Sequence, residues 1–396
     1  MKALIPLRII DLQFNLIDEI TGYESLQITR SWSGIGSIEL KINRHIRGAN
    51  ELLKDRIVFP HNQLHKAYVI LHRDIDLDKE GKKSENWSIK ALPLKAWLSR
   101  RITLPPSHTA YDNKQGDAET VMKHYVDRNA VNPDDPSRII PNLVIAPSHH
   151  RGSTVSWSSR FKSLPEELEE ISLLSGIGWN VFLDIQNKKF IFDVSEGLDL
   201  TAGQSVNPPV IFSPEFNSLK SMSYTESTLS YKNMAYVAGQ GEGIDRRVVT
   251  IGTPVGLDRH ELFVDARDVE ETKDVEKTDA EGNPITEQVP RPEQDIINDL
   301  LNRGEQKLAE HADEVYLDGQ ILTKSPFVYE QDYDLGDIVT LQNREWGLTL
   351  NSRLTEIKEI YEPAGFQIEA TFGNKKPTLI DKIKQGLARM NPELTK

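Results

Sequence analysis

The stretch DYDLGDIVTLQNREWGLTLNSRLTEI, residues 332–357, alternates apolar and polar side chains in the manner of neighbouring β-strands. Turn residues at 336–337 precede an apolar run that opens at Ile338, and the polar residues 343–345 break that run. Apolar residues then resume at every second position: Trp346, Leu348 and Leu350. The pattern predicts a regular sheet, and the stretch carries no catalytic or metal-binding motif.

The bulk composition narrows the possible function classes. At 396 residues the chain has room for about two to four domains, each with its own core. It contains no cysteine, which excludes disulfides, thiolate metal sites and cysteine nucleophiles. The formal charge of −13, from 47 basic and 60 acidic residues, disfavours sequence-independent binding to nucleic acid or to anionic membranes. No apolar run approaches the ~20 residues that span a bilayer, so we expect no membrane anchor, and no signal peptide is indicated.

Residues 1–105 are predicted to form a first β domain, either a small barrel or a sandwich. Turn signals separate four runs with period-two patterning, and residues 34–36 are the clearest hairpin loop. The domain closes with PLKAWLSRRIT, in which Leu94, Trp97 and Leu98 have helical spacing. We expect this segment to cover one end of the β domain.

Residues 106–205 predict a small α+β domain. The segment GDAETVMKHYVDR has Asp117 in an N-cap position and one apolar helical face. The segment SLPEELEEISLLSGIGW starts with Ser163 three residues before Glu166, which is the spacing of a capping box, and its apolar stripe ends at Gly176. Two strands joined by a short turn, WNVFLDI and KKFIFDV, complete the predicted domain.

Residues 206–375 are predicted to form a second β domain with two irregular segments. The segment 265–291 is acidic, with nine acids and three bases between Asp265 and Glu287, and it predicts a mobile loop or the tip of a long hairpin. The segment 292–312 predicts a helical insertion with a narrow apolar stripe. The residues of that stripe are Ile296, Leu300, Leu301 and Leu308.

The last segment, 376–396, predicts a C-terminal amphipathic helix and tail. It follows a helix-compatible proline, and its apolar side consists of Leu379, Ile380, Ile383 and Leu387. The expected fold class is therefore α+β and mainly β, in the order β, α+β, β with a helical insertion, and terminal helix. No repeat with a fixed short period is visible.

Two segments have the spacing of metal ligands but lack the rest of the motif. The segment 74–85 places acids at positions one, three, five and twelve of a calcium loop: Asp74, Asp76, Asp78 and Glu85. Its glycine falls at position eight instead of six and its flanks are strand-like, so we expect a solvated hairpin tip. His61 and His65 are four residues apart in HNQLH, but asparagine replaces the glutamate of a zinc protease and a strand follows.

Two further segments resemble parts of enzyme sites. The glycine-rich segment 239–243 follows a predicted strand, but a second strand follows it instead of a helix, so it predicts a wide turn or a bulge. The pair His149–His150 lies near Ser148 and Ser153, but the chain has no nucleophile elbow and this segment is loop-like. The many acids give no specific signal of a glycosidase pair. No catalytic, cofactor-binding or metal-binding residue is assigned, and no cofactor is expected.

Several segments together resemble the tail-hub proteins of siphophages. The resemblance is carried by ITRSWSGIGSIELKIN, KALPLKAWLSRRIT, GDAETVMKHYVDR, YDLGDIVTL and IEATFGNKKPTLIDKI, and it extends over about residues 1–385. The family is similar to the N-terminal hub part of tail-associated lysins and to the baseplate hub of contractile-tailed phages. It brings no catalytic residue to this sequence. The peptidase or fibre domains that often follow the hub do not occur before Lys396, so we expect no lysin activity.

The resemblance implies two β-barrels of the tail-tube type with accessory domains outside them. Residues 1–105 and 206–375 are the candidates for these barrels. Three chains would present six barrels as a pseudo-six-fold ring that continues the tail tube and closes or opens the DNA channel. The implied location is the tail tip or baseplate of the virion. The implied partners are further copies of the chain in a homotrimer, a distal tail or tail-tube protein, the tape measure protein, receptor-binding or tip proteins, and DNA only in transit.

Two other function classes remain open at this point. A cell-wall or polysaccharide-degrading tail enzyme would require a buried carboxylate pair or a metal triad that faces a cleft. A receptor-binding carbohydrate module would require exposed aromatic clusters. Aromatic residues make up only 7% of the chain and mostly fall in strand or helix patterns, which favours the hub.

Overall fold

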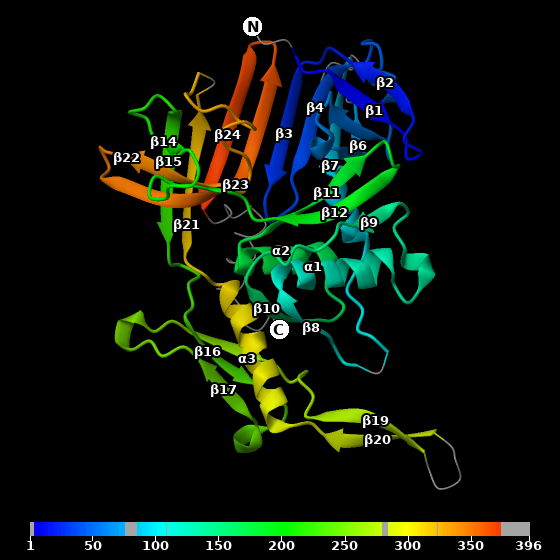
Figure 1. Cartoon of the computed structure of the whole chain (residues 1–396), viewed down its shortest axis with the longest axis vertical. Coiled ribbons are helices and arrows are strands. Elements are labelled where there is room, and N and C mark those ends of the chain that lie inside the picture. Colours follow the sequence, from blue (N-terminus) through cyan, green and yellow to red (C-terminus); the bar gives the residue numbers. More distant parts are fainter. Residues whose placement is uncertain (1–3, 76–84, 108, 279–283, 323, 374–396) are drawn as a thin grey trace, which may run out of the picture.

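The structure is mainly β with few helices, as the alternation predicts (Figure 1). This computed structural model describes residues 4–75, 85–107, 109–278, 284–322 and 324–373. No helix in these ranges is long and apolar enough to cross a membrane. The C-terminal helix that the sequence predicts lies outside the described residues.

One sheet of 14 strands contains strands from both the N-terminal and the C-terminal part of the chain. Its main path is β15-β21-β24-β23-β3-β4-β7-β6-β5-β1-β2, and β22 branches from β23 with the short strands β13 and β14. Within the described ranges this path is open, with β15 and β2 at its ends, and no closed barrel forms in one chain. The N-terminal strands are β1 (Leu7–Ile10), β2 (Leu16–Ile20), β3 (Ser25–Ser31), β4 (Ser37–Asn43), β5 (Ile57–Pro60), β6 (Tyr68–Asp74) and β7 (Asn86–Pro93). The C-terminal strands are β13 (Asp199–Leu200), β14 (Ile211–Phe212), β15 (Leu219–Ser227), β21 (Glu314–Ile321), β22 (Ile338–Asn343), β23 (Leu348–Glu362) and β24 (Gly365–Gly373).

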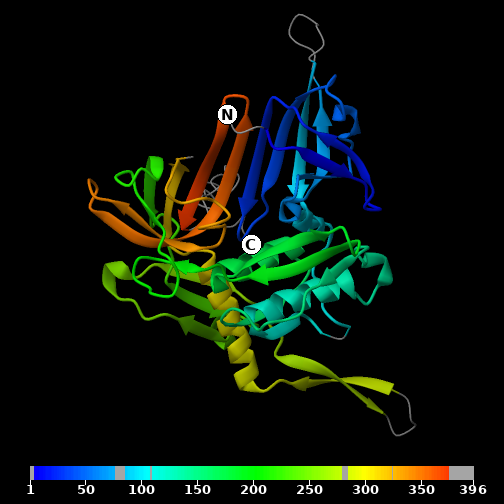
Figure 2. The same cartoon turned by 45° about the horizontal axis from the view of Figure 1, so that its top comes forward.

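Strand β23 joins the two parts of this sheet. Its first residues pair with β22, and its later residues pair with β24 on one side and with β3 on the other. The pairing with β3 is antiparallel and runs from Glu356 opposite Ser31 to Tyr361 opposite Leu26. Figures 1 and 2 show β24, β23, β3 and β4 side by side, so the N-terminal strands and the C-terminal strands meet within one sheet.

The hairpin predicted in residues 332–357 is present as β22 and β23, but the position predicted for Trp346 is wrong. Trp346 lies in the turn, where its backbone N–H donates to Asn343 Oδ1 at 3.0 Å, and its side chain is 52% exposed. Gly347 has a φ of +64°, and the strand starts only at Leu348. Strand β5 was not predicted, because its four residues are all buried and therefore show no alternation.

The α+β unit follows the N-terminal strands, and its helices begin where the sequence indicates. The Asp117 side chain caps the first helix by accepting a hydrogen bond from Thr120 N at 2.8 Å, which confirms the predicted cap. The second helix ends at Gly176, but the predicted capping box of Ser163 and Glu166 is wrong: the Ser163 side chain makes no capping bond, and its backbone forms a β-bridge with Ile102 instead. The elements are β8 (Asp112–Asp117), α1 (Ala118–Val126), β9 (Leu143–Ile145), β10 (Thr154–Ser159), α2 (Leu164–Ser175), β11 (Gly178–Asp184) and β12 (Lys189–Ser195).

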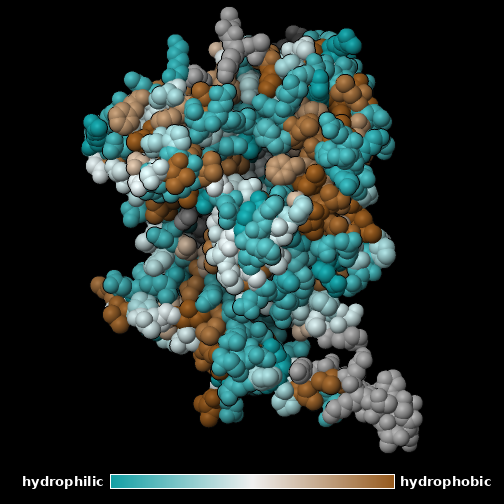
Figure 3. Space-filling model, viewed as in Figure 1, coloured by the Kyte–Doolittle hydropathy of each residue, from teal (hydrophilic) through white to brown (hydrophobic). Residues whose placement is uncertain are grey.

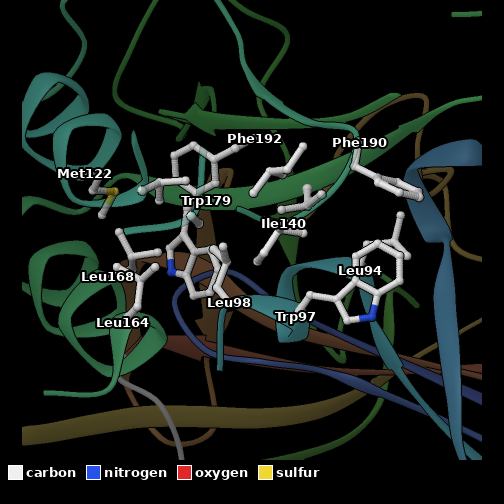
Figure 4. Close-up of a cluster of buried hydrophobic side chains, with 14 of the residues drawn as sticks. Leu94, Trp97, Leu98, Met122, Ile140, Leu164, Leu168, Trp179, Phe190 and Phe192 are labelled. Atoms are coloured by element: carbon white, nitrogen blue, oxygen red, sulfur yellow. The ribbon is translucent and has the colours of Figure 1, made fainter. Parts of the chain in front are cut away.

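The largest hydrophobic cluster lies between the α+β unit and the N-terminal strands (Figure 4). The segment Leu94–Arg100, predicted from helical spacing, is a 3-10 helix, and Leu94, Trp97 and Leu98 are buried in this cluster. The Trp97 ring meets the edge of Phe190 of β12 at a centroid distance of 4.7 Å. This segment therefore packs between the α+β unit and the N-terminal strands and holds them together through apolar contacts.

Residues between β15 and β21 form a unit with its own core. The parallel pair β16 and β18 and the antiparallel strand β17 make a three-stranded sheet, and α3 packs on one face of it. Of the predicted helical stripe, Ile296 and Leu300 are buried, whereas Leu301 and Leu308 are half-buried. The acidic segment contains an antiparallel hairpin that projects from the body (Figures 1 and 2). The elements are β16 (Met234–Ala238), β17 (Val248–Ile251), β18 (Glu261–Asp265), β19 (Thr272–Thr278), β20 (Pro284–Pro290) and α3 (Glu293–Ala309).

Several apolar side chains of this inserted unit are exposed. Figure 3 shows hydrophobic patches on the inserted unit beside the hydrophilic surface of α3. Six of its apolar side chains are at least half exposed: Leu229, Ile244, Val248, Val255, Leu257 and Phe263.

Trp32 connects three parts of the molecule directly after β3. Its Nε1 donates to the Gly176 carbonyl at 3.0 Å, and its ring packs on Gly178 of the α+β unit and on Gly336 before β22. A Cβ atom would lie 2.4 Å from the indole at position 178 and 2.0 Å at position 336, so only glycine fits at either place. The guanidinium of Arg353 lies 5.4 Å from the centroid of the same ring.

We predict that Gly178→Ala destabilises the chain by about 1–3 kcal/mol, the usual scale of overpacking. Trp32→Ala in the same chain should remove part of that loss, because the two substitutions compete for the same space. Urea unfolding of the wild type, the single variants and the double variant measures this coupling. Gly203→Ala is the matched control, since nothing lies within 4 Å of a Cβ at that position. Strictly additive effects would contradict the packing described here.

Candidate functional site

A buried ion pair lies beside the pairing of β3 and β23. Lys66, at the end of the 3-10 segment Leu64–Lys66, places its Nζ 2.6 Å from Glu359 Oε1 of β23, and both side chains are only 1% exposed. The same Nζ lies 2.9 Å from Glu330 Oε1. A buried charge without a partner is costly, so each of these groups requires the other. The N-terminal and C-terminal parts of the sheet are therefore linked by charge as well as by backbone hydrogen bonds.

The segment between β21 and β22 supplies further partners. Arg30 of β3 lies 2.8 Å from Asp334 Oδ1 and donates to Tyr329 Oη at 2.5 Å. His65 Nε2 lies 2.8 Å from Glu330 Oε1. Glu330 has a φ of +64°, an uncommon conformation for a non-glycine residue. We refer to the whole set as the joint network: Arg30, His65, Lys66, Tyr329, Glu330, Asp334 and Glu359.

The surroundings of Glu330 and Arg30 keep these two side chains ionised. Burial alone would raise the pKa of Glu330, but the hydrogen bond with His65 and the charge of Lys66 lower the pKa to about 2. Burial alone would lower the pKa of Arg30, but Tyr329, Asp334 and Glu330 raise it above its ordinary value. Glu330 and Arg30 therefore remain charged across the physiological pH range, and their contacts hold the two parts of the sheet together.

A cleft of about 560 Å³ opens next to the joint network. Its walls come from the N-terminal strands, the α+β unit and the segment before β22, and it includes Trp32, Trp179 and Asn180. Both indoles are almost fully buried, at 8% and 3% exposure, so their faces are not available to stack on a sugar. Three parts of the chain meet at this cleft. Of its acids, Glu330 and Asp334 have cationic partners, and Asp337 accepts backbone hydrogen bonds from Leu198 and Asp334.

The two histidines with zinc-like spacing contact different carboxylates. His61 Nδ1 lies 3.1 Å from Glu19 Oε2, whereas His65 belongs to the joint network. In the described ranges of the chain, no group of three or more histidine, aspartate and glutamate side chains is placed to hold a metal ion. Of the calcium-like segment, Asp74 ends β6 and Glu85 precedes β7, but Asp76 and Asp78 lie outside the described residues.

The histidine pair His149–His150 belongs to a loop that is hydrogen-bonded to the start of helix α1. The backbone N–H groups of His149 and Arg151 donate to the buried carboxylate of Glu119 at 3.1 and 3.0 Å. Arg151 also forms two side-chain hydrogen bonds with that carboxylate. Burial alone would raise the pKa of Glu119, but these hydrogen bonds lower it below its ordinary value. His150 Nδ1 lies 3.0 Å from Asp117, the cap of α1, and Ser148 Oγ accepts from the backbone N–H of His150. The arrangement fixes a loop on helix α1.

The glycine-rich segment 239–243 connects two antiparallel strands, as the sequence predicts. It lies between β16 and β17, and Gly241 has a φ of +99°. Arg246 folds back on it and donates to the carbonyls of Gly239 and Ala238 at 2.8 and 2.9 Å. The residues after the segment form a short 3-10 turn and a strand, so no long helix presents its N-terminus to an anion.

Comparison with known proteins identifies the family. The family described as Siphovirus ReqiPepy6 Gp37-like protein matches residues 6–374. The chain belongs to this family of siphovirus tail proteins. No match was found among curated proteins.

Solved structures of three tail proteins share the fold over most of their length. The prophage tail protein gp18 of Listeria monocytogenes EGD-e is 14% identical, with a TM-score of 0.52, and the match covers 97% of this chain and 98% of that chain. The 43 kDa tail protein of prophage MuSo2 from Shewanella oneidensis is 11% identical, with a TM-score of 0.51 and coverage of 93% and 98%. The tail protein of Neisseria meningitidis MC58 is 13% identical, with a TM-score of 0.51 and coverage of 93% and 96%.

We predict that replacing one member of the buried Lys66–Glu359 pair lowers the free energy of unfolding strongly, and that replacing both members lowers it by less than the sum of the two single losses. Lys66→Met or Glu359→Gln alone should destabilise the chain by about 3–5 kcal/mol, because each leaves a buried group without its partner. The double variant Lys66→Met/Glu359→Leu should lose less than the sum of the singles. Urea unfolding measures the cycle. If both single variants were as stable as the wild type, the pair would not link the two parts of the sheet.

The contribution of Glu330 to the stability of the folded chain should decrease as the pH is lowered into the acid range. Its pKa is lowered from an ordinary 4.5 to about 2 on folding, so its ionised form stabilises the folded chain above pH 4.5, and this stabilisation is lost as the pH falls toward 2. The melting temperature of Glu330→Gln should therefore be lower than that of the wild type at neutral pH and should converge with it in acid. Glu345→Gln, at an exposed turn residue, is the control. A constant difference at all pH values would be the contrary result.

Proposed function

We propose that this chain is a structural hub of the phage tail tip or baseplate and that it assembles as a homotrimer. The observation that carries the proposal is the single sheet with two parts, each with its own core, joined where β23 pairs with β3. Membership of a siphovirus tail protein family and a fold shared with prophage tail proteins support it. A regular sheet without catalytic groups suits the wall of a channel.

The two parts of the sheet are proposed to act as two tube-type β-barrels. The core of the first lies within residues 1–105, and the core of the second lies within residues 206–375 except for Leu200 of β13, which supports this division with a boundary slightly before residue 206. Residues 106–205 are proposed as an accessory α+β domain that shares the largest hydrophobic cluster with the N-terminal strands, and the segments 265–291 and 292–312 as insertions in the second part. The strand path is open in the described ranges, and the proposal is that closure takes place between copies.

Three copies with two β parts each would provide six similar positions. A cyclic assembly of identical chains uses the same contact at every interface, so three copies close a ring without a second kind of subunit. Such a ring would continue a six-fold tail tube and adapt it to a three-fold tip. Its proposed neighbours are the distal tail or tail-tube protein, the tape measure protein, and receptor-binding or tip proteins.

The ring is proposed to close or open a channel through which DNA passes. The net charge of −13 favours passage without adhesion, because an acidic wall repels a polyanion. The chain is proposed to be non-enzymatic. The contacts of His61, His65, His149 and His150 with separate carboxylates support this view over a cell-wall or polysaccharide-degrading enzyme. A clearing band in a peptidoglycan zymogram that is lost with one carboxylate substitution would overturn it.

The purified chain should form trimers in solution. Three copies of 44.9 kDa give 3 × 44.9, or roughly 135 kDa, and multi-angle light scattering at rising concentration measures this mass directly. The expected result is a rise from 44.9 kDa toward the trimer value without a plateau at the dimer. A mass that remains at one chain up to the solubility limit, or that settles at two chains, would contradict the proposed assembly.

A further inference from the structure

Two adjacent segments connect the inserted unit to the sheet. The last residue of β15 faces the first residue of β21 in their antiparallel register, so residues 228–233 and 310–313 leave the sheet side by side (Figure 1). The two segments also bind each other, because Lys232 N donates to the His311 carbonyl at 2.9 Å. A body that is attached through two neighbouring crossings can rotate about them, which is the geometry of a hinge.

Polar side chains join the inserted unit to the α+β unit. Asn302 Nδ2 of α3 donates to Ser156 Oγ of β10 at 2.9 Å, and Tyr111 Oη donates to the carboxylate of Asp268. Among the described residues, the core of the inserted unit contains no residue of the α+β unit, and the largest hydrophobic cluster contains none of the inserted unit. Units without a shared core commonly move relative to each other.

The contact between α2 and α3 brings like charges together. Glu170 of α2 lies near Glu167 of the same helix and near Glu310, which follows α3. Burial raises the pKa of Glu170 to about 7, and the two other carboxylates add to this rise, whereas Lys162 and Lys307 oppose it. The present contact of the two helices therefore has an unfavourable electrostatic component, which lowers the free-energy cost of rearranging it.

A cleft of about 450 Å³ opens between the two units. Tyr111 and Arg160 line it from the α+β unit, and Glu270, Arg291 and Arg303 line it from the inserted unit. The guanidinium groups of Arg160 and Arg303 lie 5.9 and 5.2 Å from the centroid of the Tyr111 ring. Charged side chains of both units therefore meet at this cleft.

Arg160 and Glu270 are the two charged residues of the cleft without an ion-pair partner in the described part of the chain. Arg291 and Asp299 pair with each other at 2.5 Å, and Arg303 pairs with another acid of the inserted unit at 3.0 Å. The side chains of Arg160 and Glu270 are both exposed. A cation on one wall and an anion on the other wall thus lack only each other.

We propose that the inserted unit is a hinged body that closes this cleft, and that Arg160 and Glu270 form an ion pair in the closed state. The rotation takes place at residues 228–233 and 310–313. Charge complementarity between the two walls selects the closed position. The closed and open states present the exposed side chain of Leu257 differently to a partner. The motion belongs to one chain, so the inference goes beyond the proposed hub and does not rest on the homotrimer.

Distances between two spin labels test the motion. The chain has no cysteine, so Lys188→Cys and Leu257→Cys supply two specific and exposed label positions, one on each unit. Lys54→Cys with Leu257→Cys supplies a second direction. Labelled chains diluted with unlabelled chains report distances within one chain only. We expect two distance populations in pulsed electron spin resonance. A single population in both label pairs that Arg160→Glu leaves unchanged would overturn the proposal.

Charge reversal tests the ion pair. Arg160→Glu should lower the ratio of closed to open chains about two- to fivefold, the scale of an exposed ion pair, and adding Glu270→Arg should restore the ratio. Neither side chain makes a hydrogen bond in the described ranges, so both variants should fold. Lys220→Glu, exposed on β15 and outside the cleft, is the matched control. If the double reversal does not restore the ratio, the ion pair is wrong.

A disulfide between the same two positions provides an independent measurement. Arg160→Cys/Glu270→Cys should form a bond within one chain on oxidation, and small-angle X-ray scattering should then give a smaller radius of gyration than after reduction. Lys188→Cys/Glu270→Cys is the control, and both of its thiols should remain reactive toward a maleimide. A disulfide that forms without a change in scattering would mean that no closure takes place, and it would overturn the proposal.

Discussion

The pairing of β3 with β23 in one register is the constraint on which the rest of the structure depends. Side chains alternate between the two faces of a sheet, so a slip of one residue would turn every side chain of β23 to the other face. Such a slip would remove Glu359 from Lys66, at a distance of 2.6 Å, and leave two buried charges without partners. The ion pair therefore acts mainly as a register lock. A pair of apolar side chains could stabilise the sheet equally well without this specificity.

The same register places the other parts of the chain. Trp32 follows β3 directly, and its ring fits only between Gly178 and Gly336, so the α+β unit and the C-terminal strands meet at one point. Glu330 and Arg30 then close the joint between β22 and β3. The molecule is consequently built as two β parts on one sheet, with an α+β unit on one side and an inserted unit that makes its own core.

Alternation in the sequence predicted the strands well, because a half-exposed strand shows the period of two. It identified the strands from Ser25 to Asn43 and the β11–β12 pair. It missed β5, whose residues are buried on both faces, and it extended the second strand of the hairpin to Trp346. The alternation of side chains also does not show which strand pairs with which. The pairing of β23 with β3, which is distant along the chain, was therefore not predictable.

The joint network was missed for a related reason. Ile357, Glu359 and Tyr361 occupy alternate positions of β23, so a glutamate in the phase of the apolar residues was the available signal. Its partner Lys66 lies in a short segment without a pattern, and no rule of spacing relates the two residues. Candidate chemistry based on local spacing, such as His61 with His65, failed in the opposite way. These two histidines are close in the sequence, but in the structure each contacts a different carboxylate.

We propose that each chain contributes two β parts to a ring of three. Cryo-electron microscopy of the intact virion tail, with the density at the tail tip averaged without imposed symmetry, tests this claim most directly. We expect three copies of this chain around the axis, with the N-terminal and the C-terminal part of each sheet alternating at six positions along the channel wall. Six copies, or three copies with only one part of each sheet at the channel, would contradict it.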